Sequence, residues 1–351
     1  MTDTLIIGGG QAGLATAYHL TRAGRDCLVL DEGERVGDSW RRRWPSLRLY
    51  SPARYDGLPG MPFPAPRHSF PTGREMADYL EAYARRFELP VRTGVQVESL
   101  ERDGDRYVAV ADGTRYEAWK VIVATGGFRD PFVPAFAGEL DRSIRQLHSH
   151  DYRGPEQLQE GRVLVVGAAH SGGDIAFELA QAGHETLLSG RDTGQIPFRL
   201  EGRAMKVVFP VLRFMWTRVL TVRTPIGRKA RRKMREHGGP LLRVKNSDLR
   251  DAGVERVARV AGVTEGTPVL EDGRVVEIAN VVWCTGFHND YSWIRIPLPL
   301  GEDGYPEQTR GAVAGVPGLY FVGLKFQHSF ASTLILGAVR DAEQVANQIA
   351  A

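Results

Sequence analysis

Two glycine-rich turns constrain the fold of this chain more than any other feature. The first lies in LIIGGGQAGL (5–14) and the second in VLVVGAAHSGGD (163–174). Each follows a short apolar run and precedes a segment with one apolar face, which predicts a strand, a tight turn and a helix. The segments align at a constant offset, so that Gly8, Gly13 and Gly24 correspond to Gly167, Gly172 and Gly183. This alignment indicates a duplicated βαβ unit.

The length and the duplication together predict the domain organisation. A chain of 351 residues is long enough for two domains. We expect an α/β fold with two Rossmann-like, three-layer dinucleotide-binding domains, the second inserted in the first. The expected limits are residues 1–150 for the first part of the first domain, 151–275 for the second domain with a basic, apolar insert at 195–240, and 276–351 for the second part of the first domain.

Both turns have the pattern that cradles a phosphate. Glycines let the backbone approach a pyrophosphate, and the following helix offers free N–H groups to its oxygens. A plain glycine turn is the alternative, but the strand and helix on either side favour a nucleotide site in both copies. The candidate residues are Gly8, Gly10, Gln11, Ala12 and Gly13 in the first turn and Gly167, Ala169, His170, Ser171 and Gly172 in the second.

The residues after the next strand differ in charge between the two units. In the first unit they are Asp31 and Glu32, and a carboxylate there accepts hydrogen bonds from ribose hydroxyls and repels a 2′-phosphate. In the second unit Arg191 occupies the position of Glu32, and its guanidinium can hold a 2′-phosphate by two hydrogen bonds. An exposed loop charge is the alternative for Arg191. The pattern favours FAD in the first unit and NADPH in the second.

The two cysteines, Cys27 and Cys284, form no C-x-x-C pair, which excludes a dithiol redox centre. The lack of a disulfide framework favours a reducing cytoplasm. No signal peptide or membrane-spanning run is visible, and no histidine has metal-ligand spacing with a partner. We therefore expect a cytoplasmic protein without a metal site.

Positive charge is concentrated in residues 199–235. This segment holds 12 Lys or Arg residues and one acid, Glu201, together with large apolar residues such as Phe214 and Trp216. Three interpretations remain open: a lid over the substrate site, a face in peripheral contact with the inner surface of an anionic membrane, and a solvated pair of helices. Nucleic-acid binding is not expected, because no recognised module accompanies the charge.

Nearly the whole chain resembles the flavin-containing monooxygenases, a group of flavoproteins with two dinucleotide-binding domains. The matching motifs are GGGQAG (8–13), LDEGERVGDSW (30–40), VATGG (123–127), GAAHSGGD (167–174), WCTGF (283–287) and YFVGLKFQHSF (320–330). The stretch RWPSLRLYSPARYDGLPGMPFP (43–64) is similar to the auxin-synthesis branch and its bacterial relatives. The resemblance implies that Gly37, Trp40, Thr125, Gly126 and Gly323 also contact FAD. An ordinary core aromatic is the alternative for Trp40.

The family fingerprint before the second turn, F-x-G-x-x-x-H-x-x-x-(F/Y), is matched in its downstream half only. His148 and Tyr152 occupy the last two positions, whereas Arg142 and Ile144 replace the Phe and Gly. Tyr152 stands where Baeyer–Villiger enzymes have Trp, which disfavours that subgroup.

The segment expected near the flavin also departs from the family. Many members have an Asn there, but residues 47–52 contain none, and Ser51 is the nearest small polar residue. The tail has Gly323-Leu324 in place of the Gly-Asp pair that is common in related disulfide reductases.

The resemblance implies an FAD- and NADPH-dependent monooxygenase. In this family the reduced flavin reacts with oxygen to form a C4a-hydroperoxide, which transfers one oxygen atom to a small, fairly apolar organic substrate. Two alternatives are a reductase that passes NAD(P)H electrons to a protein or quinone, and a non-catalytic FAD-binding sensor. The sequence identifies no catalytic acid, base or nucleophile, which suits a reaction carried by the cofactor. The expected partners are the substrate and molecular oxygen.

Overall fold

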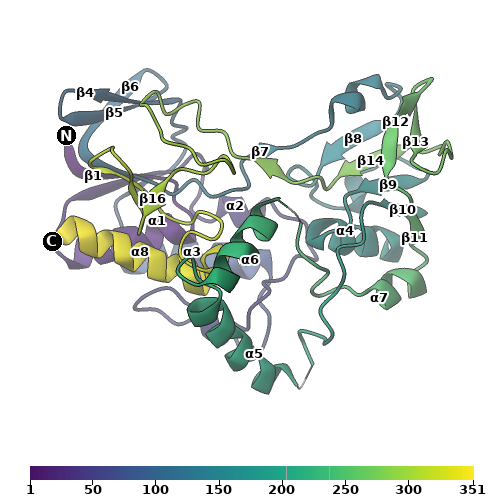
Figure 1. Ribbon diagram of the computed structural model, residues 1–351, viewed down its shortest axis with the longest axis horizontal. Helices are drawn as coiled ribbons and strands as arrows, with labels where there is room; N and C mark the ends of the chain where they lie inside the picture. The colour runs from purple at the N-terminus through teal and green to yellow at the C-terminus, as the bar shows by residue number, and fades with distance from the viewer. Residues whose placement is uncertain (203, 237) are drawn as a thin grey trace.

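The protein consists of two sheets with helices packed against them, joined by two connections (Figure 1). The computed structural model describes residues 1–202, 204–236 and 238–351. Both chain termini lie in the unit that contains the first sheet, at the left of Figure 1, and the second sheet lies at the right. This arrangement confirms the predicted α/β fold with two Rossmann-like units.

The first sheet has nine strands in the order β16-β17-β18-β6-β1-β2-β3, with β5 pairing to β6 and β4 to β5. The strands β3, β2, β1, β6 and β18 run parallel, and their buried residues explain the apolar runs of the sequence. The bounds are β1 (Thr2–Ile7), β2 (Cys27–Leu30), β3 (Val91–Arg92), β4 (Ser99–Asp103), β5 (Arg106–Ala111), β6 (Thr114–Val123), β16 (Gln308–Thr309), β17 (Ala312–Val313) and β18 (Leu319–Phe321).

Helices α1 and α8 pack side by side against this sheet, and their apolar residues share one core with those of α3. A capping box between Thr72 and Glu75 begins α3. The bounds are α1 (Gln11–Arg22), α2 (Asp38–Arg41), α3 (Gly73–Arg86) and α8 (Ile335–Ala350), with short 3-10 turns η1 (Ala53–Tyr55) and η5 (Phe330–Thr333).

The second sheet has five parallel strands in the order β11-β10-β9-β14-β8. Helices α4 and α7 pack together beside it, and the hairpin β12-β13 lies at its outer end (Figure 1). The bounds are β8 (Arg145–His148), β9 (Val163–Val166), β10 (Thr186–Ser189), β11 (Glu255–Val257), β12 (Val260–Thr264), β13 (Thr267–Leu270), β14 (Asn280–Trp283), α4 (His170–Gln181) and α7 (Asn246–Asp251), with 3-10 turns η2 (Ala135–Glu139) and η3 (Pro155–Gln157).

The second sheet lies in sequence between β6 and β18, so the second unit is inserted in the first, but its limits differ from the expected 151–275. Strand β8 precedes residue 151 and β14 follows residue 275, and both belong to the second sheet. The short strand RQLH at the sheet edge is too polar to be recognised from its pattern. The run NVVW resembles the end of β6, yet it pairs with β9 and β8. Strand pairing therefore moves both limits outward.

The two connections between the units contact each other through a short antiparallel pair of strands, β7 (Asp130–Pro131) and β15 (Phe287–His288). The basic insert forms α5 (Met205–Phe214), a π-helical stretch η4 (Met215–Val219) and α6 (Pro225–Glu236). It packs on the first unit, where Phe209 stacks on Tyr55 at 5.0 Å and Trp216 stacks on Phe330 at 5.3 Å between ring centroids. Among the described residues, no helix is both long and apolar enough to cross a membrane.

Candidate functional site

The first glycine turn links β1 to α1. Gly8 has a φ of +109°, and a Cβ atom there would lie 2.5 Å from the carbonyl oxygen of Ala124, so only glycine fits. A Cβ atom at Gly13 would overlap the carbonyl oxygen of Gly8. At Gly10, the N-cap of α1, a Cβ atom would meet no described atom within 4 Å, and no described side chain caps the helix. The turn thus presents the N–H groups that begin at Gln11 to open space.

Asp31 lies beside this turn and holds it in place. Its carboxylate accepts hydrogen bonds from the N–H groups of Gly9, at 2.5 Å, and Gly33, at 2.9 Å. The neighbouring Glu32 is exposed and lies 3.9 Å from Arg129, in the connection that follows β6. Carboxylate oxygens have several lone pairs, so both residues retain acceptors for a ribose hydroxyl.

Trp40 contacts both units. Its Nε1 donates a hydrogen bond to Oε1 of Gln11, at 3.2 Å. Its ring packs against the cluster that contains Ile175 and Ala176 of α4, the helix after the second turn. Trp40 is half-buried, so it is an aromatic between the two units rather than part of one closed core.

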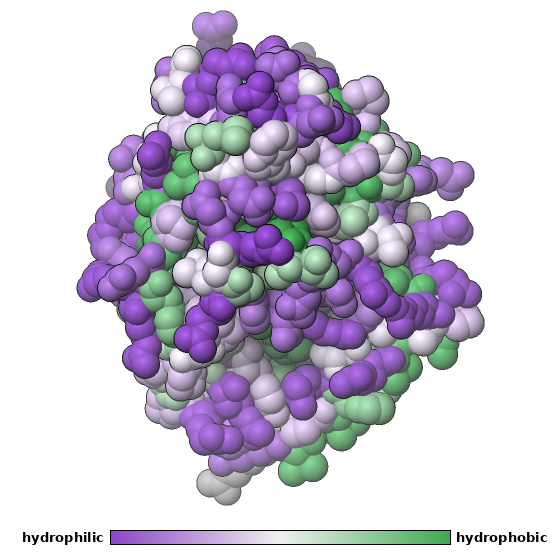
Figure 2. All heavy atoms as spheres, turned by 90° about the vertical axis from the view of Figure 1, so that its left-hand side faces the viewer, coloured by the Kyte–Doolittle hydropathy of each residue, from purple (hydrophilic) through white to green (hydrophobic). Residues whose placement is uncertain are grey.

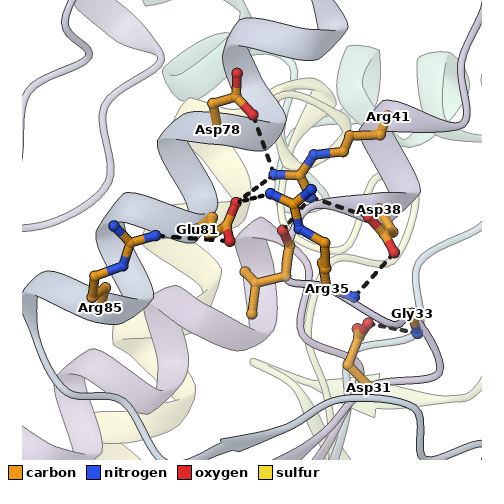
Figure 3. Close-up of polar contacts among 9 residues, drawn as sticks. Asp31, Gly33, Arg35, Asp38, Arg41, Asp78, Glu81 and Arg85 are labelled. Atoms are coloured by element: carbon orange, nitrogen blue, oxygen red, sulfur yellow. Dashed lines mark hydrogen bonds and ion pairs between the residues drawn. The ribbon is translucent and has the colours of Figure 1, made fainter.

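An ion-pair network attaches residues 32–41, called here the Trp40 loop although its last residues form α2, to α3 (Figure 3). The Arg41 guanidinium contacts Asp38 at 3.1 Å, Asp78 at 3.2 Å and Glu81 at 2.7 Å, and Arg35 also contacts Glu81, at 2.8 Å. Hydrogen bonding to Arg35 lowers the pKa of Glu81, with the charge of Arg41 adding to the effect. The network fixes the loop that carries Trp40.

Gly37 fits the same loop closely against α3. It has a φ of +92°, and a Cβ atom there would lie 2.5 Å from the carbonyl oxygen of Ala77. Glycine is therefore required for packing at this position, whatever else the loop contacts.

Three other expected residues lie near the same edge of the first sheet. Thr125 and Gly126 follow β6, which pairs with β1, and a Cβ atom at Gly126 would meet no described atom within 4 Å. Gly323 follows β18 and lies against the start of α1, since its Cβ atom would be 3.1 Å from Cβ of Ala12. The structure thus brings the candidate residues of the first unit to one edge of the sheet.

The second glycine turn repeats the geometry of the first. Gly167 also has a φ of +109°, and Gly172 lies directly against its carbonyl oxygen. Ala169 is the N-cap of α4, and no described side chain caps this helix either. Ser171 follows in the first turn of α4 and is half-buried. The turn again leaves the N–H groups at the start of a helix without a side-chain acceptor.

His170 begins α4 and faces the first unit. The centroids of its ring and the ring of Tyr50 are 5.3 Å apart. Burial lowers the pKa of His170 to about 4, and the positive charge of Lys325 contributes. The imidazole is therefore neutral at pH 7, so at this turn it donates or accepts a hydrogen bond without a charge.

Arg191 follows β10 and is exposed beside an open cleft of about 620 Å³. The cleft is lined by Gly190, Asp192, Asn246, Arg250, Val254, Arg256 and Val257. Arg256, on β11, donates from Nη2 to the carbonyl oxygen of Gly190 at 3.3 Å. Asp192 accepts a hydrogen bond from the N–H of Gly194 at 2.8 Å. Arg250 and Arg256 belong to no sequence motif; Arg256 reaches the cleft through the pairing of β11 with β10, and Arg250 reaches it from α7.

The fingerprint residues His148 and Tyr152 have structural contacts. Nε2 of His148 lies 3.0 Å from the carbonyl oxygen of Gly286, and its Nδ1 accepts from the N–H of His150 at 3.0 Å. Tyr152 is fully buried and donates to Oε1 of Glu178 in α4 at 3.0 Å. His148 thus contacts the connection that follows β14, and Tyr152 contacts α4, so both residues have structural roles.

Ser51, the small polar residue in place of the family Asn, is buried and donates a hydrogen bond to Oδ1 of Asp56. Asp56 has no exposed surface, and its Oδ2 has no hydrogen-bond partner among the described residues. Burial raises the pKa of Asp56 to about 8, although the hydrogen bond from Ser51 opposes this shift. The Ser51 hydroxyl proton is thus used in a hydrogen bond within the first unit.

Comparisons with known proteins agree with this geometry. A family model described as pyridine nucleotide-disulphide oxidoreductase matches residues 5–199. An uncharacterized CzcO-like oxidoreductase from Geobacillus kaustophilus is 36% identical over 351 residues, covering 99% of this chain and 98% of that protein. A probable indole-3-pyruvate monooxygenase from Arabidopsis thaliana is 27% identical, covering 99% of this chain and 86% of that protein. The structure of a flavin-containing monooxygenase from Stenotrophomonas maltophilia has a TM-score of 0.78 and 26% identity, covering 99% of this chain and 98% of that one.

The relatives and the structural neighbour confirm the resemblance to flavin-containing monooxygenases, and they confirm the oxidoreductase class. The match spans both units rather than one turn. The chain belongs to the pyridine nucleotide-disulphide oxidoreductase family.

Proposed function

We propose that this protein is an FAD- and NADPH-dependent monooxygenase that transfers one oxygen atom, through a flavin C4a-hydroperoxide, to a small and fairly apolar organic substrate. One observation carries the proposal. Two glycine turns of the same geometry present uncapped helix N-termini, and Trp40 contacts the structure at both turns. The similarity to monooxygenases over nearly the whole chain supports the same reaction class.

We assign FAD to the first turn and NADPH to the second. Helix N-termini favour phosphate, and the open space before Gly10 is what a pyrophosphate requires. Asp31 and Glu32 would accept hydrogen bonds from the ribose of FAD, and Arg191 with Arg256 would hold the 2′-phosphate of NADPH. The other FAD contacts are assigned to Gly8, Gly10, Gln11, Ala12, Gly13, Gly37, Trp40, Thr125, Gly126 and Gly323, and the other NADPH contacts to Gly167, Ala169, His170, Ser171 and Gly172.

When bound, NADPH supplies a hydride and the flavin supplies oxygen activation. The residues of the chain would bind and orient the two cofactors and would exclude water. Trp40 and Tyr50 stand between the two turns and would set the distance between the cofactors. The insert covers the first unit through Phe209 and Trp216, and this apolar contact would keep water from the reacting centre. The lid interpretation of the insert follows from the same contacts.

Labelled oxygen tests the reaction. The purified protein, loaded with FAD, is mixed with NADPH, isotopically labelled oxygen and a panel of small apolar amines, sulfides and ketones. Indole-3-pyruvate belongs in the panel because a relative carries that activity in its name. We expect one labelled oxygen atom in one product, with NADPH and oxygen consumed in equal amounts.

The alternatives give different results in the same assay. A reductase would oxidise NADPH without oxygen when a quinone is supplied, and would yield no labelled product. A sensor would bind FAD but leave NADPH unoxidised. Either result would exclude the monooxygenase.

A further inference from the structure

The outward face of α5 carries large apolar side chains that no described part of the protein covers. The exposed residues on this face and directly after it are Val207 (76% exposed), Val211 (61%), Phe214 (60%) and Met215 (39%). Their spacing of four, three and one residues places them on one side of the helix. We call these four residues the α5 stripe.

The opposite face of α5 is apolar as well and accounts for the attachment of the helix. Met205 and Phe209 are buried there in a cluster with Phe70 and Leu200. A surface helix of a globular protein normally has one apolar face toward the core and a polar face toward water. Since the inner face already supplies the packing, the fold gives no reason for the α5 stripe.

Cations lie on the same segment as the α5 stripe: Lys206 and Arg213 on α5, Arg218 on η4, and the others after them in the chain. Eight Lys or Arg side chains between residues 206 and 233 are exposed: Lys206, Arg213, Arg218, Arg223, Arg228, Lys229, Arg232 and Lys233. Other cations of the segment contact carboxylates, as Arg235 contacts Asp303 at 2.6 Å and Arg199 contacts Asp248 at 2.7 Å. Between Lys206 and Lys233 the sequence contains no acid, and the acids that flank this stretch are Glu201 and Glu236. The surface therefore combines apolar side chains with a strong positive charge.

We propose that the α5 stripe docks on an anionic lipid bilayer. Helix α5 lies at the lower tip of the molecule, away from both sheets (Figure 1), and hydrophobic residues gather at the lower right of the mostly hydrophilic face in Figure 2. A protruding apolar ridge can enter the headgroup region of a bilayer without a matching groove, while the flanking cations meet lipid phosphates. A protein partner would need a complementary acidic groove. The proposal is independent of the proposed enzymatic reaction.

Vesicle flotation tests the proposal with the full-length, FAD-loaded protein. We expect the protein to float with vesicles that contain phosphatidylglycerol and to float far less with pure phosphatidylcholine, with binding weakened by salt. The double variant Val211→Glu/Phe214→Glu should bind the anionic vesicles roughly tenfold or more weakly. The control Val275→Glu, at a position 57% exposed on the distant second unit, should bind like the parent protein.

Two control measurements accompany the flotation assay. The FAD content and thermal transition of the double variant should match those of the parent, which separates lost docking from lost folding. Failure of the parent protein to float with anionic vesicles at low salt would overturn the proposal. A second outcome would also overturn it. If the parent protein forms a concentration-dependent dimer, the double variant does not, and neither binds vesicles, then a second copy of the chain covers the α5 stripe.

Discussion

The ring centroids of Tyr50 and His170 lie 5.3 Å apart, so this contact links the first unit to the second glycine turn. Tyr50 belongs to the segment that follows the Trp40 loop, and His170 is the first residue of α4. The contact holds together the two units to which the proposed pair of cofactors is assigned. A neutral imidazole meets a phenol here, so the contact is polar but carries no charge from these two residues.

Replacing Arg191 should change the preference between the two nicotinamide cofactors. The Arg191→Ala variant loses a charge-assisted contact to the 2′-phosphate, so its KM for NADPH should rise roughly tenfold or more while its KM for NADH stays nearly constant. Steady-state flavin reduction with each cofactor measures both values. Arg162→Ala, which removes a partly exposed arginine of the same unit that contacts Glu185, is the control. Equal increases for NADPH and NADH would exclude the assigned role.

Removing the Asp31 carboxylate should weaken FAD binding. Asp31→Ala leaves the N–H groups of Gly9 and Gly33 without their acceptor, which loosens the first turn and removes a partner of the ribose. The bound flavin, measured by absorbance after dialysis, should fall well below one equivalent. Glu34→Gln, a change at an exposed position of the same loop, should retain full occupancy. If Asp31→Ala keeps its flavin, the ribose assignment is wrong.

The Arg41 network should stabilise the Trp40 loop measurably. Arg41 is 18% exposed and contacts three carboxylates, so Arg41→Ala should lower the free energy of unfolding by about 1–3 kcal/mol. Arg85 contacts Glu81 at 3.7 Å but is 78% exposed, and Arg85→Ala should cost less than about 1 kcal/mol. Urea denaturation of both variants provides the comparison. Equal losses would mean that Arg41 contributes no more than a surface charge.

The main elements of the fold could be predicted because their causes are local. Gly8 and Gly167 occupy backbone conformations that favour glycine, and both follow four consecutive buried residues, so each turn is visible in a short window. Strand β8 was missed because its residues, RQLH, do not form an apolar run. Its place in the second sheet depends on pairing with β14, more than a hundred residues away.

The sequence predicts those residues of the candidate site that lie in recognisable motifs, and no others. Asp31 and Trp40 lie in recognisable stretches, whereas Arg256 reaches the Arg191 cleft through the pairing of β11 with β10. Likewise, nothing in the pattern around Ser51 indicates that its hydroxyl is held by the buried Asp56. Contacts between distant segments decide these positions, and a single sequence contains no direct signal for them.

Asp56 should make the protein less stable as the pH rises. Burial raises its pKa from 3.8 to about 8, so the unfolded state releases this proton at a lower pH than the folded state does. The stabilisation is therefore complete below pH about 4 and is lost progressively as the pH rises toward about 8. The free energy of unfolding, measured by urea denaturation across this range, should fall less steeply for Asp56→Asn, which should be more stable than the parent near pH about 8.

Comparing the two proteins cancels the opposite contribution of buried histidines such as His170, whose lowered pKa costs stability as the pH falls below about 6.5. Asp103→Asn, at an exposed side chain, should leave the slope unchanged. Parallel curves for the parent and Asp56→Asn would show that Asp56 does not carry a raised pKa in the folded protein.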